Sequence, residues 1–478
     1  MPRVTNDVGF RSERGSVLAA IMVTTGLVAI DATILATAVP TIVADLGGFS
    51  QFPWLFSIYL LTQAVSVPIY AKLSDLFGRK PIILIGIGLF LVGSILCGFA
   101  WSMPALIAFR AVQGLGAGAV QPMSITIVGD IYSVAERAKV QGYLASVWAV
   151  SSVVGPSLGG LFAQLDAWRW VFFVNIPLCL LAGWMLVRHL HETVERREHR
   201  IDYLGAGLLT VAMTLLILAV LEGGQAWAWN SWQSLGAFGT GGLLLVAFVL
   251  VERRAPEPIL PLWVFRRRLL LTTTLVSFGV GALLIGLTSF VPTYLEGSIG
   301  AVPLVAGFSL AALTLGWPLA AGFSGRFYLR IGFRSTALIG GGLALLGTVL
   351  LALFARTPSV ALVAVACFIV GLGMGLIAST TLIAAQASVE WGERGVVTGT
   401  NLFARSIGSA VAVAVFGAIA NVWFGEAAVP TPEAIVSGSA AVFIAVAVVM
   451  AGTWLAAVAM PRTPVTPREP DAVAEPAA

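Results

Sequence analysis

Charged residues are scarce in this chain of 478 residues. Asp, Glu, Lys and Arg together account for 10% of the sequence, whereas soluble domains carry about 25%. Hydrophobic residues account for 58%. This composition excludes an ordinary soluble protein and indicates an integral membrane protein. The net charge of +4 is explained by membrane topology and does not indicate a nucleic-acid partner.

Cysteine, histidine and lysine are almost absent, with three residues of each. The cysteines fall in separate apolar runs and have neither metal-ligand spacing nor a partner for a disulfide. The histidines share one loop, and no lysine follows a glycine, so no phosphate-binding loop for ATP is present. No metal, cofactor or ATP is therefore expected. The sequence also shows no nucleophile–base motif, so no enzyme activity is expected.

Long apolar runs make up most of what is present. They are roughly 18–25 residues long, the length at which a helix spans a bilayer, whereas barrel strands would be shorter and would alternate in polarity. The sequence therefore predicts an all-α integral membrane protein. Fourteen transmembrane helices are expected, at about 17–38, 53–71, 82–101, 104–128, 140–163, 170–188, 203–221, 235–251, 270–294, 304–324, 336–354, 360–383, 397–421 and 437–459.

Lysine and arginine are distributed unevenly among the connecting segments. Of the 27 residues, 23 fall in the two tails and in alternate turns, two fall in the opposite loops, and two, Arg110 and Arg405, fall inside spans. An excess of positive charge marks the cytoplasmic side of a membrane protein. Both termini of this multi-pass protein are therefore expected on the cytoplasmic side of the cell membrane. That topology requires an even number of spans and argues against a cleaved signal peptide.

Internal matches indicate a duplicated unit. FRAVQGLGAG at 109–118 matches FIVGLGMG at 368–375, and ERAKVQG at 136–142 matches ERGVVTG at 393–399, both at an offset of 257 residues. A weaker match aligns Gly78 with Gly332, at an offset of 254. Two copies of a six-helix unit with two helices inserted between them are therefore expected.

The repeat also predicts the domain organisation. The predicted segments are a cytoplasmic N-terminal tail at 1–16, a six-helix bundle at 17–190, linker loops with an inserted two-helix hairpin at 191–268, a second six-helix bundle at 269–460 and a disordered cytoplasmic tail at 461–478.

The turn after the second span carries a compact set of charges. It contains Asp75, Gly78, Arg79 and Lys80. Asp75 can cap a helix N-terminus and pair with a basic group across the boundary between the two bundles. The turn is therefore a candidate for a gating contact on the cytoplasmic side, and the alternative is a solvated turn.

The fourth span contains a cation inside an apolar run. Arg110 is costly in lipid and is a functional candidate by default. Gln113 lies one turn away on nearly the same helix face. The residue equivalent to Arg110 in the second copy is Cys367, so the repeated scaffold does not require this charge.

The fifth span contains the sequence SSVVGPSLGGLF. Gly155 and Pro156 are expected to weaken the helix and to kink it, and Gly159 and Gly160 are expected to allow close packing on a neighbour. Small-residue packing alone is the alternative interpretation. The second copy lacks the Gly-Pro pair at the same offset of 257.

These motifs resemble those of the major facilitator superfamily. The charged turn is similar to the family's loop between its second and third helices, and the Gly-Pro sequence is similar to the motif of its antiporter branches. DATILATAVP at 31–40 and AWRWVFFVNIP at 167–177 resemble the fourteen-span drug/proton antiporters. The resemblance covers nearly the whole chain. It implies the major facilitator fold in a 6 + 2 + 6 arrangement and a substrate site between the halves near the bilayer midplane.

Asp31 is the main buried acid available for coupling. It lies in the middle of the first apolar run, where a charged carboxylate is costly and protonation is favoured. The resemblance implies that this first-helix acid exchanges a proton, and a cationic substrate can compete for the same group. A structural ion pair between Asp31 and Arg110 is an alternative that is compatible with this role.

Two further charged residues are secondary candidates. Arg405, in the thirteenth span, is expected nearer the cytoplasmic end, where it can snorkel, bind a phospholipid headgroup or serve a structural role. Asp130 follows the fourth span and is expected to join a cytoplasmic network of ion pairs.

The sequence therefore predicts a proton-coupled exporter of lipophilic compounds, neutral or monocationic. Its expected partners are small lipophilic substrates, protons and membrane lipids, without ATP. An exporter of lipids or lipid-like metabolites on the same fold is the alternative. A membrane receptor or scaffold that transports nothing is disfavoured, because it needs neither the repeat nor the buried acid.

Overall fold

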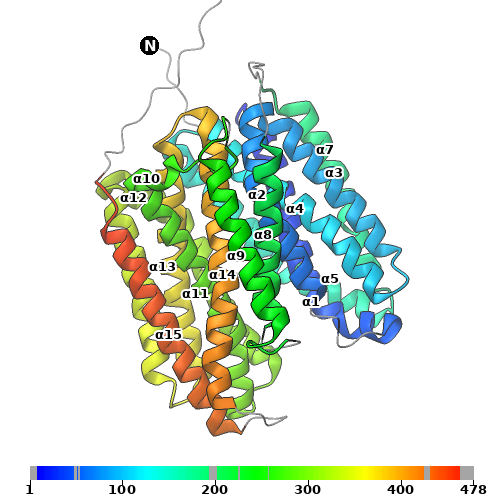
Figure 1. The fold of residues 1–478 in the computed structure, drawn as a ribbon, viewed down its shortest axis with the longest axis vertical. Coiled ribbons are helices and arrows are strands. Elements are labelled where there is room, and N and C mark those ends of the chain that lie inside the picture. The colour runs from blue at the N-terminus through cyan, green and yellow to red at the C-terminus, as the bar shows by residue number, and fades with distance from the viewer. Residues whose placement is uncertain are drawn as a thin grey trace, which may run out of the picture.

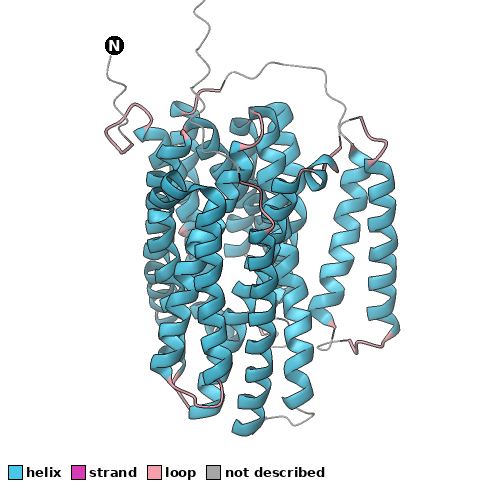
Figure 2. Ribbon diagram, turned by 90° about the vertical axis from the view of Figure 1, so that its left-hand side faces the viewer, coloured by secondary structure: helices cyan, strands magenta, loops and turns pink. Residues whose placement is uncertain are grey.

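The computed structural model of the chain describes residues 8–47, 51, 54–192, 202–223, 227–256, 258–424 and 431–462. Nearly all of these residues are helical, and no strand is formed among them (Figure 2). Thirteen helices are long and apolar enough to cross a membrane. The tail predicted to be disordered lies, except for its first two residues, outside the described part of the chain.

The helices fall into two bundles and an inserted pair. The first bundle contains α1 (Gly15–Leu46), α2 (Trp54–Phe77), α3 (Arg79–Gly98), α4 (Met103–Ile131), α5 (Val134–Gln164), α6 (Trp170–Phe173) and α7 (Asn175–His189). The insert contains α8 (Tyr203–Glu222), α9 (Trp232–Glu252) and the short α10 (Trp263–Arg266). The second bundle contains α11 (Arg268–Ile299), α12 (Pro303–Phe354), α13 (Val360–Ala387), η2 (Trp391–Glu393), α14 (Arg394–Phe424) and α15 (Pro432–Val458).

Helix α12 accounts for the difference between thirteen helices and fourteen predicted spans. It has 52 residues, and a straight helix of that length would measure about 78 Å, more than twice the hydrocarbon core of a bilayer. The helix is interrupted at Gly332, whose φ of 84° is a conformation that favours glycine. Helix α12 therefore makes two passes, and the predicted fourteen spans are confirmed. Gly78, the repeat partner of Gly332, also has a positive φ, of 96°.

The internal repeat is visible in how the helices pack. Gly116 of α4 lies against Gly86 of α3, and Gly373 of α13 lies against Gly340 of α12. The two members of each contact are related by the offsets found in the sequence, 257 for α4 to α13 and 254 for α3 to α12. Small residues allow backbones to approach closely in membrane proteins. The duplicated glycines therefore build the same helix contact twice.

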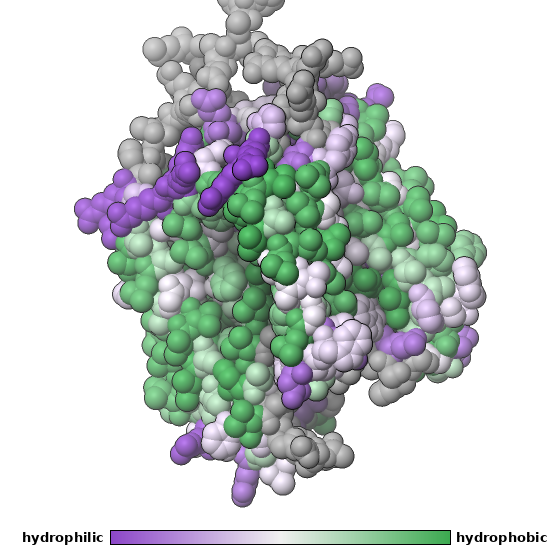
Figure 3. All heavy atoms as spheres, in the orientation of Figure 1, coloured by the Kyte–Doolittle hydropathy of each residue, from purple (hydrophilic) through white to green (hydrophobic). Residues whose placement is uncertain are grey.

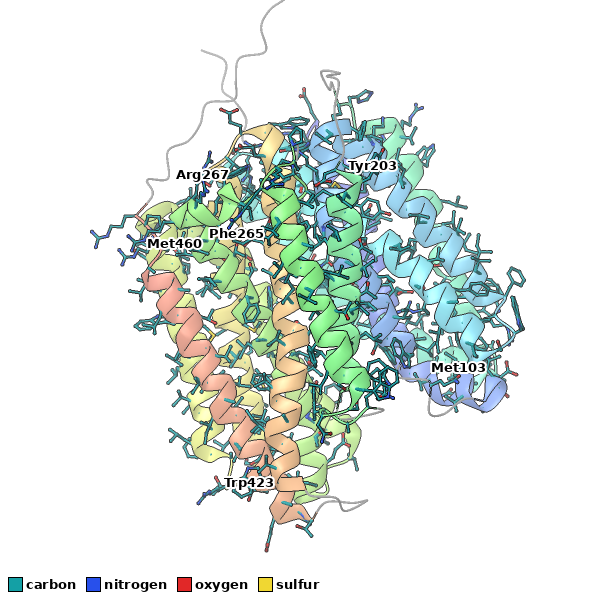
Figure 4. The ribbon with its side chains drawn as sticks, in the orientation of Figure 1. Met103, Tyr203, Phe265, Arg267, Trp423 and Met460 are labelled. Carbon is teal, nitrogen blue, oxygen red and sulfur yellow. The ribbon has the colours of Figure 1, made fainter. Side chains whose placement is uncertain are left out.

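The two ends of the molecule can be distinguished by the chain termini. We call the end at which α1 begins and α15 ends the terminal face, and Arg267 and Met460 lie there (Figure 4). Met103 and Trp423 lie toward the opposite face. Apolar side chains cover the surface between the two ends, where a membrane would surround the protein (Figure 3).

The two bundles meet chiefly along two helix pairs, α2 with α14 and α5 with α12. Their ribbons lie close together at the terminal face and diverge toward the opposite face (Figure 1). Helix α8 packs on both α2 and α14, so the inserted hairpin covers one of these seams. A mixed apolar cluster joins the three elements through residues such as Val65, Met213 and Phe403.

Candidate functional site

Asp31 forms an ion pair inside the first bundle. It lies halfway along α1, is 1% exposed, and accepts a hydrogen bond at Oδ2 from Nη1 of Arg110 on α4, over 2.8 Å. Arg110 is 2% exposed. Two charges this well buried are tolerated only when they are paired and hydrogen-bonded. The pair considered as an alternative from the sequence is therefore present in this structure.

Amide groups complete the coordination of the Asp31 carboxylate. Nε2 of Gln113 donates to Oδ1 over 2.8 Å, and Nδ2 of Asn175 on α7 donates to the same oxygen over 3.0 Å. Both amides also donate to Oγ of Ser94 on α3, over 2.8 and 3.3 Å. Four helices, α1, α3, α4 and α7, thus meet at one polar cluster, which we call the Asp31 network (Asp31, Ser94, Arg110, Gln113 and Asn175).

The remaining contacts of Arg110 come from α2. Its Nε donates to the carbonyl oxygen of Leu55 over 3.1 Å, and its guanidinium carbon lies 4.1 Å from the ring centre of Tyr59. Nη1 also donates to Oε1 of Gln113 over 2.7 Å. A cation held over an aromatic ring in a desolvated site gains further stabilisation. Two polar atoms beside the network, the Tyr59 hydroxyl and Oδ1 of Asn175, are buried without a hydrogen-bond partner.

The glycine motif of α5 packs on the segment of α1 that follows Asp31. Gly155 lies against Thr33 and Ile34, and Gly159 lies against Ile34. Oγ1 of Thr33 also donates to a backbone carbonyl of α5 over 3.1 Å. Gly160 has no neighbour within 4 Å of where a Cβ would lie, so the expected packing role is wrong for this glycine. Helix α5 is continuous through position 156.

Asp75 caps a helix of the other bundle. Its carboxylate accepts hydrogen bonds from the backbone amides of Gly395 and Val396, over 3.0 and 2.7 Å, in the first turn of α14. A carboxylate at this position satisfies free amides and interacts favourably with the helix dipole. The cap expected from the sequence is therefore present. The expected ion pair of Asp75 across the bundles is wrong, because its cationic partner is Arg79, one turn away in its own bundle.

The ion pair that joins the bundles is formed by Asp130 instead. Its two oxygens bind Nη1 of Arg394 over 3.0 Å and Nε of Arg79 over 2.9 Å. Arg79 also reaches across the boundary to Trp391, donating to its carbonyl over 2.6 Å and lying 3.8 Å from its ring centre. Asp130 and Arg79 therefore act as a bridge between α4, the turn at Gly78 and the start of α14.

Lys80 and the backbone of the charged turn are held within the first bundle. The amides of Arg79 and Lys80 donate to the carboxylate of Glu192, each over 2.9 Å, and Nζ of Lys80 donates to the carbonyl of Val187. Glu192 thus caps α3 as Asp75 caps α14. A further contact, from the Tyr328 hydroxyl to the carbonyl of Val134 over 2.6 Å, joins the bundles nearby.

All hydrogen bonds and ion pairs between the two bundles, within the described residues, lie at the terminal face. We call the contacts of Asp75, Arg79, Asp130, Trp391 and Arg394 the terminal latch. The structure is therefore closed at this face.

Arg405 is placed differently from every other candidate. It lies on α14, partly buried, with its guanidinium carbon 5.7 Å from the ring centre of Trp317 on α12. Its Nε is buried without a hydrogen-bond partner, and no ion pair of its guanidinium is formed with any residue that the structure describes. The charge of Arg110 in the Asp31 network is thus paired, whereas the charge of Arg405 has no partner among the described residues.

Sequence reasoning missed several members of these clusters. Asn175 and Ser94 belong to the Asp31 network, and Glu192 and Arg394 belong to the contacts around the charged turn. Asn175 was detectable from the sequence, because its side-chain amide lies inside an apolar run. Serine in a membrane helix gives no such signal, because it is common at helix contacts of every kind.

Comparisons with known proteins agree with this architecture. The profile of the Major Facilitator Superfamily matches residues 21–413. The chain is 37% identical over 393 residues to "Multidrug resistance protein 3" of Bacillus subtilis, covering 82% of this chain and 76% of that protein. It is 35% identical over 419 residues to "Multidrug transporter protein MdtP" of the same organism, covering 87% and 77%. The crystal structure of the human organic anion transporter MFSD10 has the same fold, with a TM-score of 0.66, 15% identity, and coverage of 93% and 99%.

Proposed function

Because the chain belongs to the Major Facilitator Superfamily, we propose that this multi-pass membrane transporter exports lipophilic drugs or toxic compounds in exchange for protons. Membership of this family indicates transport rather than catalysis. Two relatives are named as a multidrug resistance protein and a multidrug transporter, and these names support the substrate class.

The terminal face is proposed to be the cytoplasmic face of the cell membrane. The excess of Lys and Arg in the tails and in the turns of this face supports that orientation. With this topology, the terminal latch closes the space between the two bundles on the cytoplasmic side. The structure then corresponds to an outward-facing state. Opening toward the cytoplasm requires that the contacts of Asp130 with Arg394 and of Asp75 with α14 be broken.

Asp31 is proposed to carry the coupling proton, and its enclosure in the Asp31 network is the observation that supports this most directly. Deprotonated, Asp31 holds Arg110, Gln113 and Asn175 together, and so ties α1 to α4 and α7. Protonation removes one charge of the ion pair and turns an acceptor into a donor. The network must then rearrange, and the free Tyr59 hydroxyl and Asn175 Oδ1 are partners within reach of such a change.

Helix packing links this rearrangement to the boundary between the bundles. Helix α5 packs on α1 through Gly155 and Gly159, and α5 also packs on α12 of the second bundle. A shift of α1 that follows protonation of Asp31 is therefore transmitted to one of the two seams. This is the property that alternating access requires, because the two states must differ in their affinity for the proton.

The test is transport by purified protein in liposomes under an imposed pH gradient, with a lipophilic fluorescent cation as the probe. We expect Asp31→Asn to lose at least tenfold of the gradient-driven rate, because the amide has no acidic proton to exchange. Asp45→Asn is the matched control, since Asp45 lies on the same helix but is about half exposed, with its side chain 47% accessible. Thermal unfolding and size-exclusion chromatography of detergent-solubilised Asp31→Asn report whether the variant is folded.

Full gradient-driven transport by Asp31→Asn would contradict proton exchange through this residue. If the wild type transports a fluorescent phospholipid but does not transport the dye, lipid export replaces drug export as the proposed function.

A further inference from the structure

The unpaired Arg405 requires an explanation that the fold does not supply. Arginine remains protonated in proteins, so its charge cannot be removed by burial. Buried charges are therefore paired, and charged residues within membrane helices are rare and associated with function. Arg405 is partly buried, and its Nε is enclosed without an acceptor. Among the described residues, the one aromatic contact of Arg405 is with Trp317 at 5.7 Å, near the outer limit of about 6 Å for such an interaction.

Arg405 lies within an apolar helix that is long enough to span a membrane. It follows Arg394, the first residue of α14, by eleven residues, so it lies about 16 Å along a helix of 31 residues and about 46 Å. Trp317, which the guanidinium approaches, lies midway between Pro303 and Gly332 in the first pass of α12. Arg405 therefore lies nearer the terminal-face end of α14 than the opposite end, as expected from the sequence, but about three helical turns inside the helix.

The second bundle contains no acid that can reach Arg405. Its described helices contain three acidic residues: Glu296 near the end of α11, Glu393 in η2 and Glu433 in the first turn of α15. Glu296 and Glu433 lie at the opposite face, and Glu393 lies at the terminal face, twelve residues before Arg405 in the chain. The bundle therefore carries one deep positive charge without a counter-charge.

Arg405 also has no equivalent in the first bundle. The offset of 257 that relates α5 to α14 places Trp148 at the corresponding position. The shared scaffold therefore packs without a charge at this point. The backbone of α14 at Arg405 lies against Gly281 of α11, where the missing side chain permits a close helix contact.

Helices α12 and α14 are the two elements through which the second bundle meets the first. Arg405 extends from one toward the other, with the ring of Trp317 beside its charge. We propose that Arg405 is a binding subsite for the oxyanion of an amphipathic solute, with the carboxylate or phosphate on the guanidinium and an aromatic part of the solute near Trp317.

The chemistry of the subsite sets the class of solute. A guanidinium binds carboxylate and phosphate through paired hydrogen bonds, and an indole ring offers a flat apolar surface. A simple cation is repelled at this point, so the exporter is expected to prefer compounds that carry an acidic group, alone or as a zwitterion, over monocations. This inference rests on the proposed export function and narrows its substrate range.

The test uses a lipophilic rhodamine that bears a free carboxylate and its ethyl ester, in which an ethyl group replaces the negative charge. Binding of each dye to detergent-solubilised full-length protein is measured by fluorescence polarisation, for the wild type, Arg405→Gln and Arg405→Lys. We expect Arg405→Gln to weaken binding of the carboxylate dye about tenfold and to change binding of the ester less than twofold. Arg405→Lys keeps the charge and is expected to retain most of the affinity.

Three results would overturn the subsite: an equal loss for both dyes, no loss for either, or a wild type that binds the ester but not the carboxylate. The last result leaves drug export intact, whereas failure of the wild type to bind or transport either dye contradicts the proposed function itself.

The oxyanion of a phospholipid headgroup is the other source of the same chemistry. Binding is therefore repeated in nanodiscs of phosphatidylcholine with and without phosphatidylglycerol. The proposal expects the carboxylate dye to bind with similar affinity in both. If the two dyes bind with equal affinity only when phosphatidylglycerol is present, the lipid headgroup occupies the site. That result would overturn the proposal of a solute-binding subsite.

Discussion

Arg110 and Arg405 both lie deep within membrane-spanning helices, yet their surroundings differ. Arg110 has the Asp31 carboxylate, an amide, a backbone carbonyl and an aromatic ring around it. Arg405 has one distant ring and no hydrogen bond from the described residues. The repeat provides a scaffold for both bundles, so neither charge is required for packing. Arg110 has its counter-ion, Asp31, within the chain. The proposed counter-ion of Arg405 is a bound solute.

The first way to break this comparison is to remove each arginine in turn. Arg110→Met leaves the Asp31 carboxylate buried without a cation, which is expected to cost about 3–5 kcal/mol in the free energy of unfolding. The double variant Asp31→Asn with Arg110→Met removes both charges and is expected to recover most of that loss. Unfolding of the detergent-solubilised proteins by denaturant measures both values.

Equal destabilisation by Arg110→Met and Arg405→Met would show that the two arginines do not differ in the way their contacts indicate.

Removal of a donor to Asp31 tests the network that surrounds the first charge. Asn175→Ala deletes a hydrogen bond to a charged oxygen and is expected to cost about 1.5–3 kcal/mol of stability. Asn401→Ala is the matched control, because Asn401 is an equally buried asparagine in the second bundle whose partners, Ser277 and Val397, are neutral. Its expected cost is about 0.5–1.5 kcal/mol. Thermal unfolding ranks the two, and the reverse order would argue that Asp31 is uncharged in the folded protein.

The comparison can be sharpened by giving Arg405 an internal partner. Trp317→Glu places a carboxylate near the guanidinium, so that Arg405 becomes paired as Arg110 is. Binding of the carboxylate-bearing rhodamine is expected to fall about tenfold relative to Trp317→Gln, which is about 1.4 kcal/mol. Fluorescence polarisation gives both affinities. Similar affinities in the two variants would mean that the dye does not bind at the Arg405 charge.

The smallest expected effect is on the stability of the protein without Arg405. Arg405→Leu removes a charge that has no partner in the chain, so the free energy of unfolding is expected to change by less than about 1 kcal/mol, in the stabilising direction. Arg356→Leu, at an arginine in a loop of the opposite face, is a control for loss of positive charge. A large loss of stability in Arg405→Leu alone would indicate a structural role.

Much of the fold could be predicted from the sequence because a bilayer permits few backbone arrangements. Every backbone group in the hydrocarbon must be hydrogen-bonded within the chain, so apolar runs of sufficient length become helices. The apolar runs predicted separate spans at 304–324 and 336–354, and the break between them falls at Gly332, the residue that the repeat aligns with Gly78. The positions of the domain boundaries remain predictions, as does the gating role of the charged turn.

The candidate site could be predicted only in part. Asp31, Arg110 and Gln113 were detectable one by one, because each is a polar group in an apolar run. That they meet was not detectable, since Asp31 and Arg110 are 79 residues apart in the chain. The same holds for Asp75. Its tendency to cap a helix follows from local chemistry, but its pairing with Arg79 rather than with a cation of the other bundle depends on how the bundles dock.

The sequence by itself determined the helices, their number, the duplicated scaffold and the charges that lipid would not tolerate without a reason. Those properties depend on hydropathy and local chemistry, which act over a single helix. Only the tertiary structure decided which charges have partners, because pairing depends on the distance between side chains on helices that are far apart in sequence. That distance makes Arg110 part of a closed network and leaves the guanidinium of Arg405 without a counter-ion in the described part of the chain.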